Sequence, residues 1–126
     1  MNKMQVMVRY FHEKYGHSTG DINNLPSQDV LDFRKKLIEE EKIELEEAIE
    51  NKDLVKICDG LGDLLYVIFG FGNVLGVDLE PIFTEIHRSN MSKDMPDNGT
   101  SKPIKGKNYF PPDLKGVLDS MRGNQR

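Results

Sequence analysis

Four carboxylates at helical spacing are the residues of this chain most suited to chemistry: Glu41 and Glu44, then Asp59 and Asp63. Glu41 and Glu44 are three positions apart and the two aspartates are four apart, so each pair shares one face of a helix. On helical wheels both pairs fall on narrow stripes with apolar residues, and no lysine or arginine falls on those stripes. Charges are rarely buried unless they are paired or bind a metal. Since hard cations prefer oxygen ligands, the pattern predicts a Mg²⁺ site, with Mn²⁺ as the alternative.

The two pairs can form one site only if their helices pack together. The segment Asn51–Lys52 is a short connection, and each pair lies roughly two turns from it. An antiparallel helical hairpin would therefore bring both pairs to the same level. Asp63 is the strongest ligand candidate, because leucine and valine residues surround it in the sequence. For Asp59 the alternative is an exposed residue near a helix start, and for the acidic run 39–50 it is a solvated helix face.

Other catalytic chemistries find less support in the residues. A di-iron carboxylate bundle needs Glu-x-x-His on two helices, whereas the nearest pair here is Glu85-x-His87. No serine has an activating context, and we expect Cys58, the one cysteine, to pack inertly in the core. The glycines between residues 60 and 76 are typical of close helix approach. Hydrolysis by a metal-activated water is the chemistry that remains.

Apolar periodicity predicts an all-α fold with a four-helix-bundle-like core and an extended C-terminal segment. We expect helices at about 2–15, 28–50 and 53–75, then one of about fourteen residues after Asp78. Ser27, Asp53 and Asp78 are the expected N-caps. Residues 1–94 would form the helical core, and residues 95–126 a loop with a short helix near 113–121, all in one domain.

Length and charge narrow the class of protein. A chain of 126 residues suffices for one domain, and its formal net charge of −4 argues against a general affinity for nucleic acid. A single cysteine fits a reducing cytosol, so we expect a cytoplasmic protein. The longest uncharged stretch, from Leu64 to Val77, is shorter than the roughly 18 apolar residues of a membrane span. We therefore expect no membrane association.

The acidic motifs also resemble a known group of enzymes. The chain is similar to the all-α nucleoside triphosphate pyrophosphohydrolase superfamily, which includes MazG-like enzymes, dimeric dUTPases and phosphoribosyl-ATP pyrophosphohydrolases. The matching segments are Arg34-x-x-Leu37-Ile38-x-Glu40-Glu41-x-x-Glu44-Leu45, Asp59-Gly60-Leu61-Gly62-Asp63-Leu64-Leu65-Tyr66-Val67, Val8-Arg9-x-Phe11-His12, His87-Arg88-Ser89-Asn90-Met91-Ser92-Lys93 and Lys105-Gly106-x-Asn108-Tyr109-Phe110-x-Pro112. The last three resemble the phage and bacterial branch labelled phosphoribosyl-ATP pyrophosphohydrolase-like.

The resemblance implies Mg²⁺-dependent cleavage between the α and β phosphates of a nucleotide. By position it makes Glu41, Glu44 and Asp63 metal ligands, and Glu40 the residue that orients or deprotonates the attacking water. The second motif of the superfamily is usually Glu-x-x-Asp, but the first place of that spacing is Gly60 here. Either Asp59 substitutes for the missing glutamate or the site holds fewer metals.

Substrate contacts are expected mainly after the acidic motifs. The resemblance assigns Asn90 and Lys93 to the base, sugar or phosphate, and cations near the phosphates are needed to balance the ligand's charge. Tyr109 either stacks on a base or anchors the C-terminal segment, and the nearby lysines could equally form a solvated tail. The predicted substrate-binding residues are Arg34, Arg88, Asn90, Lys93, Lys105 and Tyr109.

The leading hypothesis is a Mg²⁺-dependent enzyme that hydrolyses unwanted (deoxy)nucleoside triphosphates to monophosphate and pyrophosphate. One alternative is a non-catalytic helical protein that binds a metal or nucleotide and assembles through it. The other is a phosphoribosyl-ATP pyrophosphohydrolase. The superfamily buries its active sites between subunits, so the resemblance implies a homodimer or homotetramer, with the face of Met4, Met7, Phe11 and Tyr15 as one candidate interface.

Overall fold

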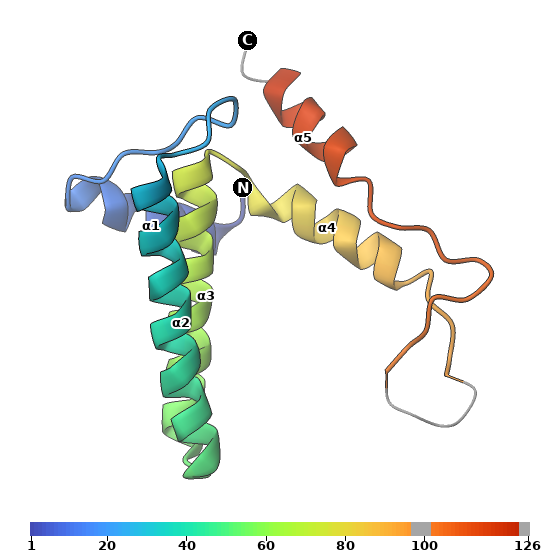
Figure 1. Ribbon diagram of the computed structural model, residues 1–126, viewed down its shortest axis with the longest axis horizontal. Helices are drawn as coiled ribbons and strands as arrows, with labels where there is room; N and C mark the ends of the chain where they lie inside the picture. The colour runs from blue at the N-terminus through green and yellow to red at the C-terminus, as the bar shows by residue number, and fades with distance from the viewer. Residues whose placement is uncertain (97–101, 124–126) are drawn as a thin grey trace. The chain divides into compact units, whose positions relative to one another are not determined.

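The computed structural model describes residues 1–96 and 102–123, and it confirms the all-α class with a helical-bundle core. Apart from two isolated β-bridges, the described residues form helices, turns and loops (Figure 1). The expected helices are present, with ends within a few residues of their predicted places. They are α1 (Lys3–Lys14), α2 (Gln28–Glu50), α3 (Leu54–Leu75), α4 (Leu79–Asn90) and α5 (Leu114–Gly123).

The chain forms two compact units, residues 1–79 and residues 80–126. The predicted domain organisation, with 1–94 and 95–126 in a single domain, stays a prediction. Among the described residues no single helix is long and apolar enough to cross a membrane, and only α3 and α4 taken together as a bent pair meet the length and composition test. The cytoplasmic location likewise stays a prediction.

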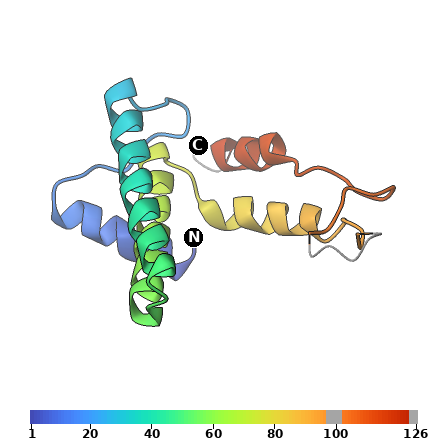
Figure 2. The same ribbon diagram turned by 60° about the horizontal axis from the view of Figure 1, so that its bottom comes forward.

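In the first unit, α2 and α3 form an antiparallel hairpin, and α1 lies across it against α3 (Figures 1 and 2). The turn between α2 and α3 places Lys52 in the left-handed region, at a φ of 52°. Asp53 then caps α3 by accepting a hydrogen bond from the Lys56 amide at 3.3 Å. Ser27 caps α2 in the same way, through the Val30 amide at 3.4 Å. These local signals set the level at which residues of α2 and α3 face one another.

Gly60 allows the two helices of the hairpin to approach closely. A β-carbon built at Gly60 would lie 3.2 Å from Cα of Leu45 on α2, a backbone atom that cannot move without shifting the helix. A β-carbon built two residues later, at Gly62, would have no neighbouring atom within 4 Å. The predicted role of these glycines in helix approach is therefore confirmed for Gly60, and Gly62 does not share it.

Alanine substitutions at these two glycines are expected to change stability in opposite directions. Gly60→Ala forces a methyl group against α2 and should lower the free energy of unfolding by about 1–3 kcal/mol. Gly62→Ala relieves the entropic cost of glycine inside a helix and should raise it by about 0.5–1 kcal/mol. Urea unfolding of both variants provides the measurement. Equal effects at the two positions would contradict the close approach at Gly60.

A buried amide network ties α1 to the end of α3. Gln5 is fully buried, and its Nε2 donates to Oδ1 of Asn73 at 3.0 Å and to the carbonyl of Val77 at 2.7 Å. Its Oε1 accepts from the Leu79 amide at 2.9 Å. The Asn73 side chain donates back to the Gln5 carbonyl at 3.2 Å. Because every one of these buried amide groups has a hydrogen-bond partner, the network costs little desolvation free energy. It fixes the position of the chain where α3 ends.

In the second unit, a carboxylate on α4 holds the segment that leads into α5. Glu85 pairs with Arg88 through two contacts of 2.7 and 2.8 Å and accepts the Asp113 amide at 2.6 Å. The Arg88 guanidinium, followed by the Asp113 amide, lowers the pKa of Glu85 to about 2. Buried Ser89 donates to the carbonyl of Phe110 at 2.8 Å. The segment before α5 is therefore fastened along α4.

The expectation for Cys58 is wrong. Its side chain is exposed on α3 instead of packing inside the hairpin. The physical reason is that the apolar residues of α3 surround the whole helix, and α1 and α2 cover only part of that surface.

Candidate metal centre

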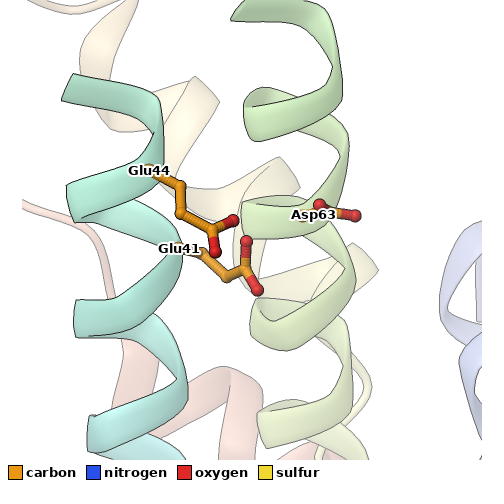
Figure 3. Close-up of side chains that lie close together, drawn as sticks. All are labelled: Glu41, Glu44 and Asp63. Carbon is orange, nitrogen blue, oxygen red and sulfur yellow. The ribbon is translucent and has the colours of Figure 1, made fainter. Parts of the chain in front are cut away.

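Three of the four predicted ligands converge between α2 and α3. Glu41 and Glu44 project from α2 toward α3, which carries Asp63 (Figure 3). One carboxylate oxygen from each residue lies within 4.8 Å of the other two. The acidic triad, as we call these three residues, is thus assembled by the packing of the hairpin.

The electrostatics of the acidic triad are unfavourable without a cation. Glu41 is half-buried, and its Oε2 has no hydrogen-bond partner among the described residues. Desolvation raises the pKa of Glu41, and the negative charges of Glu44 and Asp63 raise it further. A divalent cation would satisfy the orphaned oxygen and cancel this repulsion. The donor set, which consists of carboxylate oxygens alone, fits a hard ion such as Mg²⁺.

Asp59 lies beside the acidic triad without belonging to it. Its side chain is exposed and lines a hollow of about 250 Å³ together with Glu44, Glu47 and Lys56. The adjacent Gly60 is pressed against Leu45, so the place of the superfamily's usual glutamate has no room for a side chain unless α2 shifts. The cluster within the described residues therefore has three carboxylates, and a ligand role for Asp59 stays a prediction.

The remaining predicted residues divide between the two units. Glu40 is exposed on α2, next to Glu41 and outside the cluster. Arg34 is buried on α2, seven residues before Glu41. The other five are in the unit of residues 80–126, and their substrate roles stay predictions.

Within that second unit, all five of these residues have intramolecular contacts. Arg88 pairs with Glu85, and its guanidinium lies 4.4 Å from the centre of the Phe110 ring. The Lys105 ammonium lies 5.3 Å from the centre of the Tyr109 ring. Asn90 and Lys93 occupy the end of α4 and the turn after it, where the Lys93 amide donates to the Asn90 carbonyl at 3.1 Å.

Comparison with known families gives the acidic triad its context. The family model described as phosphoribosyl-ATP pyrophosphohydrolase matches residues 8–90, which include the whole triad. The chain belongs to this family. Membership in the phosphoribosyl-ATP pyrophosphohydrolase family confirms the resemblance to the all-α nucleotide pyrophosphohydrolases, whose members generally depend on divalent metals.

A viral relative shares part of this family region. The uncharacterized protein L479 of Acanthamoeba polyphaga mimivirus is 34% identical over an alignment of 77 residues, and the match covers 58% of this chain. The match covers 31% of the relative, so the chain spans about a third of that protein's length.

Sequence reasoning missed one polar cluster next to this metal centre. His12 and His17 had no assigned place, yet their rings stack at 5.5 Å beside Arg34 on the α2–α3 hairpin. The available signal was Arg34 itself, which lies seven residues before Glu41 and just outside its narrow stripe, so the expectation that no arginine accompanies the carboxylates overlooked it. An arginine at such a position needs the same explanation as a buried glutamate.

Proposed function

We propose that this protein is a Mg²⁺-dependent nucleotide pyrophosphohydrolase that releases pyrophosphate from (deoxy)nucleoside triphosphates. The observation that carries the proposal is the acidic triad with its orphaned Glu41 oxygen, in a chain of the phosphoribosyl-ATP pyrophosphohydrolase family. A triphosphate is itself strongly anionic, and it can enter an acidic site only when cations lie between the two.

The chemistry divides between the cation and the protein. Glu41, Glu44 and Asp63 would hold the ion, which when bound supplies charge neutralisation at the phosphates and polarisation of a water molecule. Glu40 immediately precedes Glu41, in the same turn of α2. It is our candidate for the base that takes the proton of the attacking water. The water oxygen forms a bond to the α phosphorus, and the bond from that phosphorus to the bridging oxygen breaks. Nucleoside monophosphate and pyrophosphate leave.

Two substrate classes share this chemistry. If nucleoside triphosphates are the substrates, the enzyme would remove unwanted nucleotides. If phosphoribosyl-ATP is the substrate, the enzyme would have the activity after which the family is named. The family match supports the two equally. A metal- or nucleotide-binding protein without turnover is the remaining alternative, kept because Gly60 replaces the usual glutamate of the second motif.

A substrate panel tests the proposal. The purified protein would be incubated with each NTP and dNTP and with phosphoribosyl-ATP, in Mg²⁺, in Mn²⁺ or in EDTA, and the products separated by ion exchange. We expect monophosphate and pyrophosphate with at least one substrate, and none in EDTA. Absence of product from every substrate would contradict the enzymatic proposal. A Mg²⁺-dependent rise in melting temperature without turnover would favour the binding protein.

We also propose that the chain assembles as a homodimer or homotetramer. Apolar side chains remain exposed along one face of α1 and along a second face on α3. Contiguous apolar patches on a soluble domain typically mark interaction sites.

A further inference from the structure

A pocket of about 470 Å³ lies among the loop after α1, the start of α2 and the end of α3. We call it the Arg34 pocket, after one of the residues that line it. His17, Asp21, Phe33 and Arg34 are among the side chains that line it, and all of its lining residues belong to the unit of residues 1–79. It is distinct from the acidic triad, none of whose residues lines it.

Arg34 is a buried cation that has no counter-charge in the part of the chain that the structure describes. It is only 6% exposed, and its Nε has no hydrogen-bond partner among those residues. Among the described residues no carboxylate lies within ion-pair distance of its guanidinium. Burial lowers the pKa of Arg34, in keeping with the cost of removing a cation from water. Buried charges are normally paired, so the simplest explanation is that this site binds an anion from outside the chain.

The surroundings of Arg34 add further polar groups. His12 is 6% exposed, its Nδ1 also lacks a hydrogen-bond partner among the described residues, and its ring stacks on that of His17. Gly70 makes room for both side chains: a β-carbon there would lie 3.0 Å from Nη1 of Arg34 and 3.2 Å from Nε2 of His12. Guanidinium groups bind phosphate in bidentate fashion.

The charges around the pocket are of both signs. Val30, in the first turn of α2, also lines the pocket, so the positive end of that 23-residue helix lies beside it, although the same turn carries Asp29. The opposing charge is Asp21, whose carboxylate is exposed and accepts hydrogen bonds from the Asn23 amide at 2.9 Å and the Asn24 side chain at 2.8 Å. Asp21 is thus held by its own turn, whereas Arg34 has no such partner.

We propose that the Arg34 pocket binds a phosphate group. Arg34 precedes Glu41 by seven residues, so the two lie on nearly the same face of α2, about 10 Å apart along its axis. Gly70 follows Asp63 by the same interval on α3, which places the pocket and the acidic triad two turns apart on one hairpin seam. The phosphate is either a second phosphate of the nucleotide held at the triad or a free phosphate ion. Only the first of these sources rests on the proposed function.

Metal-free binding of inorganic phosphate tests the proposal on the full chain. In EDTA, ³¹P NMR titration should show saturable binding to the wild-type protein. Arg34→Gln is expected to weaken it by about tenfold or more, since hydrogen bonds to charged groups are among the stronger ones. Lys35→Gln, the same charge change at the neighbouring exposed position, should leave it unchanged. Glu41→Gln should also retain it, even though that variant is expected to lose turnover.

A second variant guards against misfolding of the first. His17 is exposed on the pocket rim, so His17→Gln should fold and weaken phosphate binding several-fold. No saturable binding to the wild-type protein, or equal binding by wild type, Arg34→Gln and His17→Gln, would overturn the proposal. So would an oligomer that dissociates on Arg34→Gln without any phosphate response, because a carboxylate of the second copy would then be the partner of Arg34.

A comparison of two nucleotides separates the two sources of phosphate. Phosphoribosyl-ATP carries phosphate at both ends and ATP at one end. If the pocket takes the second phosphate of the nucleotide, Arg34→Gln will weaken Mg²⁺-dependent binding of phosphoribosyl-ATP and leave that of ATP unchanged. If it takes a free ion, inorganic phosphate will bind alongside either nucleotide, and Arg34→Gln will affect the two nucleotides equally.

Discussion

Glu41→Gln is expected to lower kcat/KM on any accepted nucleotide by about a hundred- to a thousandfold, the usual effect of losing one preorganised electrostatic contact to the reacting groups. The substitution keeps the shape of the side chain and removes one of only three clustered carboxylates. It should also abolish the rise in melting temperature caused by Mg²⁺ in the wild-type protein. Initial rates across substrate concentrations and thermal melts with and without Mg²⁺ provide the two measurements.

Glu46→Gln is the matched control for this prediction. Glu46 lies on the same helix, is exposed and pairs with Lys42 at 3.6 Å, so its loss should leave turnover and the Mg²⁺ response unchanged. Wild-type rates in Glu41→Gln would contradict the assignment of the acidic triad as the catalytic metal site, whatever the substrate.

Stability of the metal-free protein should change in the opposite sense to activity. Desolvation and the neighbouring carboxylates raise the pKa of Glu41 above its usual value of 4.5, so the ionised side chain disfavours the folded state. This penalty is fully present above the raised pKa and fades as the pH falls toward 4.5. Glu41→Gln should therefore unfold at a higher denaturant concentration than wild type at neutral pH in EDTA, and the difference should shrink on acidification.

The parts of this protein that could be predicted from sequence are those governed by local rules. Ser27 and Asp53 cap their helices because the required oxygen lies three residues before the free amide, which is visible in any sequence. Glu41 and Asp63 could be paired across the hairpin because a short turn fixes the level of both helices. Asp59 shows the limit of this reasoning, since it lies one turn before Asp63 on α3 and lines the adjoining hollow instead of joining the triad.

The parts that were missed depend on contacts between distant residues. Gln5 and Asn73 are 68 positions apart, and neither amide looks unusual until both are buried. His12 and Arg34 likewise become informative only through Gly70, whose missing side chain leaves room for both. Exposure of Cys58 could not be foreseen because a helix that is apolar all round gives no indication of which face its own chain will cover.

Leu65→Asp is expected to raise the dissociation constant of a homo-oligomer by about a hundredfold or more, as for a buried apolar anchor at an interface. Leu54, Leu61, Leu65 and Ile68 follow one stripe of α3 at heptad spacing, with Cys58 filling the remaining place. The four apolar side chains are between 39% and 73% exposed, so the first unit alone does not cover this seam. Analytical ultracentrifugation at several concentrations would measure the shift toward monomer.

Val55→Asp is the control, because Val55 is exposed on the same helix but lies about 100° from the stripe. A wild-type chain that sediments as a monomer, or a Leu65→Asp variant with unchanged mass, would contradict the heptad seam as an interface.

Glu41→Gln and Leu65→Asp also separate assembly from chemistry. Glu41→Gln should keep the wild-type mass while losing turnover, since Glu41 faces the hairpin interior and not the exposed stripe. A monomeric Leu65→Asp protein still contains the complete acidic triad and should still respond to Mg²⁺ in thermal melts. If that monomer binds the metal but has lost turnover, the second copy must supply part of the substrate site. Full turnover by the monomer would place every group needed for hydrolysis within a single chain.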